Sequence, residues 1–151
     1  MEELKQPHSK ELIEEMEYAL RKVSGIIKQK GREILTNFPI TPPQFVALQC
    51  LNEDGDMTIG ELSNKMYLAF STTTDLVDRM EKNELVERVR NQKDRRVVSI
   101  HLLDKGRRII EEVIEARRNY LSSVVADMSN DQVKKTNDLI LALFQAMNQD
   151  L

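Results

Sequence analysis

Residues 58–102, TIGELSNKMYLAFSTTTDLVDRMEKNELVERVRNQKDRRVVSIHL, decide the fold of this 151-residue chain. Their pattern predicts a helix over residues 58–66 and, after a short turn, a second helix over residues 71–82. Two short helices joined in this way form a helix-turn-helix. Two strands are expected next, over residues 85–90 and 96–102, because apolar and polar residues alternate along the second of them. The polar stretch between the strands fits the tip of a hairpin, so the whole segment predicts a winged helix-turn-helix.

Side chains that cap helices mark the expected helix starts. Thr58 and Glu61 have the spacing of a capping box, in which each side chain accepts a hydrogen bond from the other residue's backbone N–H. Ser129 and Gln132 repeat this spacing before the last expected helix. The other expected N-caps are Thr41, Ser71 and Asp104.

Long helices are expected on both sides of the winged segment. Apolar residues at steps of three and four indicate a helix over residues 9–36, a long helix after Asp104 and a final helix from Ser129. A shorter helix over residues 41–52 leads into the winged segment. Because the first helix is longer than one small domain can cover, we expect part of its apolar stripe to meet a second copy of the chain.

These elements divide the chain into two regions. Residues 1–36 and 104–151 form a helical region that joins two copies into a homodimer, and residues 37–103 form the winged helix-turn-helix. The fold class is mainly α, with about six helices and a two-stranded wing. The composition agrees, because only four prolines and five glycines interrupt the chain, which favours long helices.

The composition also indicates the cellular compartment of the protein. No apolar run approaches the roughly 18 residues needed to span a bilayer, and the acidic N-terminus does not resemble a secretory signal. The single cysteine, Cys50, excludes an internal disulfide framework and fits a reducing compartment. We therefore expect a cytoplasmic protein without a membrane partner, in which Cys50 is buried and inert.

Positive charge is concentrated in the hairpin and just after it. The net charge is −3, but residues 86–108 hold eight lysines and arginines against three acids. The first 20 residues hold six glutamates against two lysines. A concentrated basic patch is what binding to phosphate groups requires, so double-stranded DNA is the expected partner.

The second helix of the pair begins with small residues that carry hydroxyl groups. Hydroxyl groups suit both phosphate oxygens and base edges, and short side chains let a helix lie deep in the major groove. A plainer interpretation makes Ser71 only an N-cap and the threonines only solvated. The expected DNA contacts on this helix are Ser71, Thr72, Thr73, Thr74 and Arg79.

The tip of the hairpin carries the second set of expected contacts. An arginine at such a tip can enter the narrow minor groove, where A·T-rich sequence deepens the negative potential. We expect Arg95 and Arg96 to do so, with Asp94 orienting the guanidinium group. A charged turn that only keeps the hairpin soluble is the alternative. Phosphate contacts are expected from Arg88, Arg90 and Lys93, with the alternative that they are edge-strand charges that prevent strand pairing.

Several short motifs occur in the order typical of one family. They are Pro43-Gln44-Phe45, Leu62 to Met66, Ser71 to Met80, Leu85-Val86-x-Arg88, Asp94-x-Arg96 and Leu102 to Gly106. Together they resemble the winged-helix core of the MarR family of bacterial transcriptional regulators. The resemblance implies an obligate homodimer formed by the terminal helices, a recognition helix in the major groove and a wing in the minor groove. It also implies a pseudo-palindromic site, usually repression, and release by a small aromatic or amphipathic ligand bound between the two regions.

The sequence departs from that family at two turns. Where the family usually has glycine after the recognition helix, this chain has Asn83 and Glu84. Asparagine tolerates the left-handed conformation, so Asn83 is expected to take the role of the glycine. The family's usual Leu-Thr before the next long helix is Leu102-Leu103 here, so Asp104 is expected to supply the cap.

Motifs for catalysis or for a bound metal are missing from the sequence. It has no P-loop, H-E-x-x-H, G-x-S-x-G or paired-cysteine motif, so we expect neither an enzyme nor a cofactor. Tyr18, Tyr67 and Tyr120 could line a ligand pocket, although packing in the core or an interface is expected. Two other classes stay open: a winged helix that binds a protein instead of DNA, and a small helical enzyme that uses carboxylates.

Overall fold

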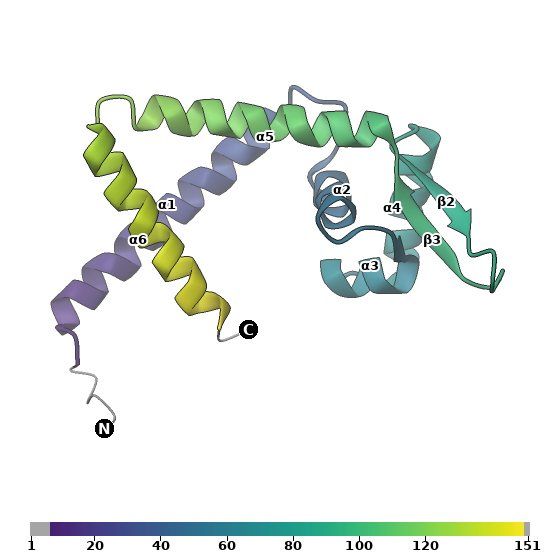
Figure 1. Cartoon of the computed structure of the whole chain (residues 1–151), viewed down its shortest axis with the longest axis horizontal. Coiled ribbons are helices and arrows are strands. Elements are labelled where there is room, and N and C mark those ends of the chain that lie inside the picture. The colour runs from purple at the N-terminus through teal and green to yellow at the C-terminus, as the bar shows by residue number, and fades with distance from the viewer. Residues whose placement is uncertain (1–6, 150–151) are drawn as a thin grey trace. The chain divides into compact units, whose positions relative to one another are not determined.

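The computed structural model describes residues 7–149, which form six helices and three short strands (Figure 1). The chain divides into two compact units, one up to Val113 and the other from Ile114. The predicted mainly helical fold with a winged helix-turn-helix is confirmed. Its elements are α1 (Lys10–Leu35), α2 (Pro42–Asp54), β1 (Met57–Thr58), α3 (Ile59–Met66), α4 (Phe70–Lys82), β2 (Val86–Arg90), β3 (Val98–Leu102), α5 (Asp104–Val124) and α6 (Asn130–Asn148).

Capping side chains start three of the helices where the sequence predicts. Thr41 Oγ1 accepts a hydrogen bond from the Gln44 N–H at 3.4 Å, and Gln44 Oε1 accepts one from the Thr41 N–H at 3.0 Å. Ser129 and Gln132 form the same reciprocal pair before α6, at 3.2 and 3.0 Å. Thr58 accepts a hydrogen bond from the backbone three residues further on, at 3.1 Å, which forms one half of the predicted box.

The N-cap of helix α4 lies two residues earlier than predicted. Ala69 occupies the N-cap position with an extended backbone and no side-chain hydrogen bond, and Phe70 is the first helical residue. Ser71 therefore lies within the first turn, and its prediction as the N-cap was wrong. The turn before α4 is short because Tyr67 adopts a left-handed conformation, with φ 55°, and reverses the chain directly after α3.

The start of α5 also differs from the prediction. Asp104 is the first helical residue, and the Leu103 carbonyl accepts the first helical hydrogen bond, from the Arg107 N–H at 3.0 Å. The Asp104 carboxylate instead pairs with the Arg107 guanidinium at 3.0 Å. The prediction of Asp104 as the cap was wrong, although an acid in the first turn still interacts favourably with the positive end of the helix.

The turn between α4 and β2 places its left-handed residue one position later than predicted. Asn83 is the C-cap with φ −87°, and Glu84 takes the left-handed conformation with φ 62°. The Leu85 N–H donates to the Met80 carbonyl at 2.9 Å and closes the end of the helix. Because α4 continues to Lys82, the left-handed position after its cap falls on Glu84, and the expectation for Asn83 was wrong.

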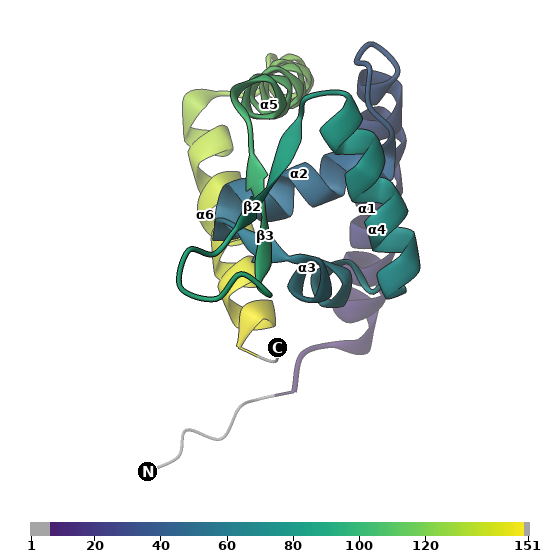
Figure 2. The same ribbon diagram turned by 90° about the vertical axis from the view of Figure 1, so that its right-hand side faces the viewer.

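The wing is the hairpin of β2 and β3, and Figure 2 shows it extending beyond α3 and α4. Its strands are antiparallel, with Val86 opposite Leu102 and Arg88 opposite Ile100. Ile100 and Leu102 are buried, which confirms the predicted alternation along this strand. β1 pairs with the other edge of β3 and makes a three-stranded sheet. β1 was not predicted, because a strand of two residues carries no periodicity.

The core of the first unit lies between α2, α3, α4, the sheet and the start of α5. α5 begins close against the hairpin at Gly106, where a Cβ atom would lie 2.6 Å from the Leu85 carbonyl oxygen. Only glycine fits such an approach, so α5 packs directly on the base of the wing. The largest fully buried side chains include Phe45, Leu48, Leu62, Met80, Leu85, Ile100 and Ile110.

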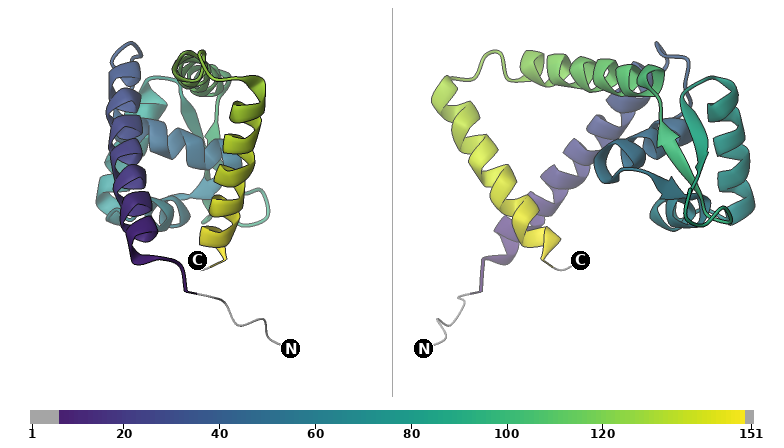
Figure 3. Two further views of the ribbon diagram at one scale, coloured as in Figure 1. Left: turned by 90° about the vertical axis from the view of Figure 1, so that its left-hand side faces the viewer. Right: turned by 45° about the vertical axis from the view of Figure 1, so that its right-hand side comes forward.

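The helices α1 and α6 expose apolar side chains, and Figure 3 shows each of them as an uninterrupted helix. The apolar stripe predicted on the first helix is therefore present and accessible in the single chain. Within residues 7–149, none of the helices combines the length and the hydropathy of a membrane span. The exposed apolar residues include Leu12, Ile13, Met16, Leu20, Val23 and Ile27 on α1, and Leu139, Ile140, Phe144 and Met147 on α6.

Candidate nucleic-acid interface

The first half of α4 presents hydroxyl groups and one aromatic ring at the surface. Ser71 and Thr72 are exposed, and Phe70 beside them keeps 62% of its surface accessible. Thr74 is half-buried, and its hydroxyl donates to the Phe70 carbonyl at 3.0 Å. Arg79 is exposed in the last turn of the same helix. Four of the five contacts predicted on α4 are thus at least partly accessible to a ligand.

Thr73 is the exception among these five residues. Its side chain is fully buried, and its Oγ1 donates to the Ala69 carbonyl at 3.1 Å. Thr73 shares the buried face of α4 with Val77 and Met80, at steps of four and three residues. A side chain in the core cannot reach a groove, so the prediction that Thr73 contacts DNA was wrong. The helical steps to Val77 and Met80 were the signal in the sequence that could have shown this.

The tip of the wing is folded by its own side chains. Asn91 Oδ1 accepts hydrogen bonds from the backbone N–H groups of Lys93 and Asp94, at 2.8 and 3.3 Å. The Val97 N–H donates to the Asp94 carbonyl at 3.0 Å and closes the turn. An asparagine that accepts from the backbone two residues further on stabilises a turn locally, so the tip has a defined shape without packing in the core.

Asp94 holds the guanidinium of Arg96, as predicted. Arg96 Nε donates to Asp94 Oδ1 at 3.1 Å, and Arg96 Nη2 donates to Asp94 Oδ2 at 3.2 Å. These hydrogen bonds lower the pKa of the Asp94 carboxyl below its ordinary value, so the carboxylate is ionised at neutral pH. The Arg96 side chain remains exposed. Its guanidinium is therefore oriented while it stays accessible to a partner.

A second arginine supports the tip from the opposite strand. Arg90 Nη1 donates to the Arg95 carbonyl at 3.0 Å and so links β2 to the end of the loop. Positive charge is concentrated around this loop, which meets the electrostatic requirement for binding phosphate groups. The exposed cationic residues here are Arg90, Lys93, Arg95 and Arg96.

Arg88 is paired with acidic side chains of the protein itself. Its Nη1 donates to Glu81 Oε1 at 2.8 Å, its Nη2 pairs with Asp78, and its backbone N–H donates to Glu81 Oε2 at 2.9 Å. Only 28% of its side chain is exposed. Both acids lie on α4, so Arg88 ties the wing to the recognition helix. The predicted phosphate contact at Arg88 is corrected to an ion pair inside the protein.

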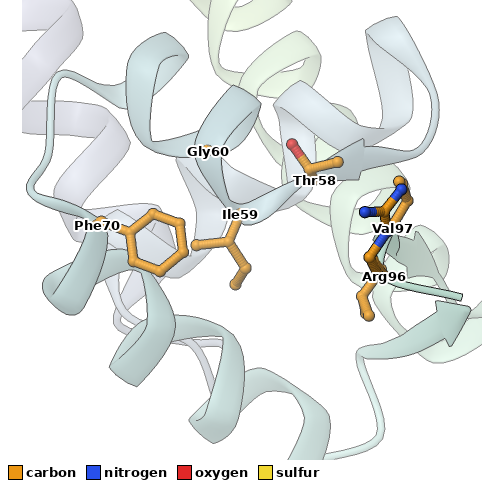
Figure 4. A pocket seen from close by; sticks show the side chains of 7 residues that line it. Thr58, Ile59, Gly60, Phe70, Arg96 and Val97 are labelled. Carbon is orange, nitrogen blue, oxygen red and sulfur yellow. The ribbon is translucent and has the colours of Figure 1, made fainter.

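A hollow of about 370 Å³ lies between the starts of α3 and α4 and the wing. Figure 4 shows the side chains of Phe70 and Ile59 on one side of this space and those of Arg96 and Val97 on the other. We call this space the wing hollow. Its lining residues are Thr58, Ile59, Gly60, Phe70, Arg96, Val97 and Val98.

The remaining candidate groups form no reactive site in the part of the chain that the structure describes. No three His, Cys, Asp or Glu side chains of residues 7–149 are placed to hold a metal ion. Cys50 is half-buried, where full burial was predicted, and this burial raises the pKa of its thiol. A raised pKa disfavours the reactive thiolate. Tyr67, for which packing was expected, is 95% exposed.

Comparisons with known proteins agree with this geometry. Residues 40–98 match the sequence model of the MarR family. YsmB of Bacillus subtilis (strain 168), an uncharacterised HTH-type transcriptional regulator, is 61% identical over 123 residues, which cover 82% of this chain and 84% of that protein. The HTH-type transcriptional repressor MdtR of the same organism is 26% identical, with 93% and 90% covered. The solved structure of a MarR family protein from Bacillus stearothermophilus is 55% identical with a TM-score of 0.85, and the match covers 94% of this chain and 99% of that one.

Proposed function

Because this chain belongs to the MarR family of DNA-binding transcriptional regulators, we propose that it binds a pseudo-palindromic operator as a homodimer and represses transcription. One observation carries the proposal: Phe70, at the start of the hydroxyl-lined α4, and the oriented guanidinium of Arg96 flank the same hollow. This arrangement supports placing α4 in a major groove and the wing in the adjacent minor groove.

The proposed contacts follow from exposure and charge. In this proposal the accessible residues of α4 contact base edges and nearby phosphates. The arginines of the wing tip enter the minor groove, and the other cations of the wing contact further phosphates. Members of this family are DNA-binding regulators and not enzymes, so the small helical enzyme is no longer an alternative. The proposed DNA contacts are Ser71, Thr72, Thr74, Arg79, Arg90, Lys93, Arg95 and Arg96.

Homodimerisation is proposed from the apolar faces of α1 and α6. A soluble monomer rarely exposes a contiguous apolar surface of this length, because such a surface promotes association. A second copy carries the same faces, so a two-fold symmetric interface would cover both at once. In this proposal residues 1–36 and 104–151 form the dimerisation region, and residues 37–103 form the DNA-binding region.

The proposed regulation follows from the spacing of two recognition helices. Successive half-sites on one side of B-DNA lie about 34–36 Å apart, so a dimer binds well only when its two α4 helices match that separation. A small aromatic or amphipathic effector in the cytoplasm would release the DNA if it binds better to a dimer with a different spacing. The name of MdtR as a repressor supports repression over activation.

The proposal is tested with the full-length protein and duplexes selected from a random pool at low salt. We expect the selected duplexes to contain two inverted half-sites and to bind two chains each. Sedimentation measures the stoichiometry, and a promoter fusion that carries the selected site measures repression. A protein that sediments as one subunit, or that enriches no sequence, contradicts the proposal and favours a winged helix that binds another protein.

A further inference from the structure

We propose that Asp75, on the exposed face of α4, selects a cytosine in each half-site by accepting a hydrogen bond from the amino group of that base in the major groove. The inference rests on the proposed DNA binding and deepens it, because it names one base and the residue that reads it. Asp75 was not among the contacts predicted on α4 from the sequence.

Asp75 lies at the centre of the outward face of α4. It is two positions from Thr73 and two from Val77, which places it about 200° around the helix from each of these buried residues. Ser71 and Arg79, four positions before and after it, continue the same exposed row. When a helix enters a major groove, the face opposite its packed side meets the base edges. Asp75 is therefore the residue of this row that lies nearest to the middle of the proposed contact.

The fold does not neutralise the carboxylate of Asp75. α4 carries two other acids, Asp78 and Glu81, and both pair with Arg88 of the wing. Within residues 7–149 the side chain of Asp75 has no hydrogen bond or ion pair. It also lies beyond the first turn, so it gains little from the positive end of the helix. An unpaired acid at this position repels the phosphates of every DNA sequence, and only a contact with a base can offset that repulsion.

The donor and acceptor pattern of the major groove favours cytosine as this base. A carboxylate only accepts hydrogen bonds. Cytosine presents the N4 amino group, whereas guanine and thymine present acceptors. Adenine also has an amino group, N6, but its N7 acceptor lies beside that group and repels a carboxylate. Asp75 should therefore favour a C·G pair, and a T·A pair should be unfavourable because thymine O4 replaces the donor.

Selection of duplexes from a random pool, by the wild-type protein and by Asp75→Asn, tests the inference. Asparagine keeps the shape of the side chain, removes its charge and adds a donor. We expect the preferences of the two proteins to differ at one position of each half-site, where the wild-type protein selects C·G. At that position, a change from C·G to T·A should weaken wild-type binding by about tenfold or more. Binding by Asp75→Asn should weaken by about threefold or less.

Binding to a duplex that lacks the selected site should change in the opposite direction. Asp75→Asn should bind such a duplex about two- to threefold more tightly at low salt, because the repulsion from the phosphates has been removed. Glu84→Gln removes the same charge beyond the C-terminal end of α4 and is the matched control. It should keep the wild-type preference at every position. Asp75→Ala should also lose the C·G preference, and it serves as the second variant if thermal unfolding shows that Asp75→Asn does not fold.

An unchanged C·G preference in a folded Asp75→Asn would overturn the inference. It would also be overturned if the position that changes is one where the wild-type protein selects a pair other than C·G. Loss of the same preference in Glu84→Gln would overturn it as well, since this would show a general effect of charge. In each of these cases the wild-type protein still binds its selected site, so the proposed function stands. If the wild-type protein enriches no sequence, it is the proposed function that fails.

Discussion

Two adjacent threonines of α4 have opposite surroundings. Thr72 is exposed, whereas the hydroxyl of Thr73 is buried and donates to a carbonyl of its own helix. Thr72→Val should therefore weaken operator binding by about 1 kcal/mol, or about fivefold, through the loss of one hydrogen bond. Thr73→Val should leave operator affinity unchanged and lower the free energy of unfolding by about 0.5–1.5 kcal/mol, because it removes one buried hydrogen bond. Gel-shift titration and thermal unfolding measure both effects, and weaker binding by a folded Thr73→Val would contradict the assignment.

The guanidinium of Arg96 is the group that Asp94 orients at the wing tip. Arg96→Ala should reduce operator affinity by at least about tenfold, or about 1.4 kcal/mol, because it removes the proposed contact in the minor groove. The dimer should remain intact, since the side chain is exposed and makes its hydrogen bonds only within the tip. Gel-shift titration beside sedimentation tests both statements. Unchanged affinity would count against the wing as a DNA contact.

Glu84 holds a backbone conformation that suits glycine better. The left-handed conformation costs a residue with a Cβ atom about 1–2 kcal/mol of folding free energy, and glycine avoids this cost. Glycine also has more conformational entropy in the unfolded chain, which lowers the free energy of unfolding by about 0.5–1 kcal/mol. With φ at 62°, Glu84→Gly should raise the free energy of unfolding by about 0.5–1 kcal/mol. Glu84→Ala keeps the Cβ atom and serves as the control, with no gain expected. Denaturant titrations compare the two variants, and equal stabilities would show that the turn is unstrained.

At the scale of secondary-structure elements, Arg88 connects β2 with α4. Arg88→Ala should lower the free energy of unfolding by up to about 1 kcal/mol, because it removes the ion pairs of the guanidinium with two partly exposed carboxylates, those of Asp78 and Glu81. The slope of log affinity against log salt should not change. Lys93→Ala should show the reverse: unchanged stability and a slope smaller by about one. A smaller salt slope for Arg88→Ala at unchanged stability would support the original prediction that Arg88 contacts a phosphate.

Local sequence signals predicted most elements but not all of their boundaries. The N-cap at Thr41 and the capping box at Ser129 were predicted because such signals need only residues within three positions of one another. The N-cap of α4 lies two residues before the predicted one, and that of α5 lies one residue before it. A residue with a hydroxyl or carboxyl group near a helix start can occupy either the N-cap or the first turn. The conformation of the segment before the helix determines which of these positions it takes. At α4 that segment is the left-handed turn at Tyr67.

At the scale of the whole molecule, the apolar face of α6 provides a test of the proposed dimer. Phe144 is an exposed apolar residue of that helix, so Phe144→Glu should place a charge within the interface and convert the dimer to monomers. Operator binding should be lost as well, because a monomer cannot hold two α4 helices at a defined separation. Lys134→Glu, at an exposed polar position of the same helix, is the control and should remain dimeric. Sedimentation and gel-shift titration distinguish the two variants, and a dimeric Phe144→Glu would contradict this interface.

The sequence by itself determined the order and type of the elements from α1 to α6 except β1, because helix periodicity, capping and hairpin signals act over a few neighbouring residues. It also determined the contact between Asp94 and Arg96, which lie only two positions apart. Only the tertiary structure decided which side chains of α4 and the wing face solvent. Thr73 enters the core, and Arg88 pairs with residues seven and ten positions earlier. The helical steps from Thr73 to Val77 and Met80 place these residues on one face, but ion pairing and the burial of a face depend on neighbours that only the folded chain brings together.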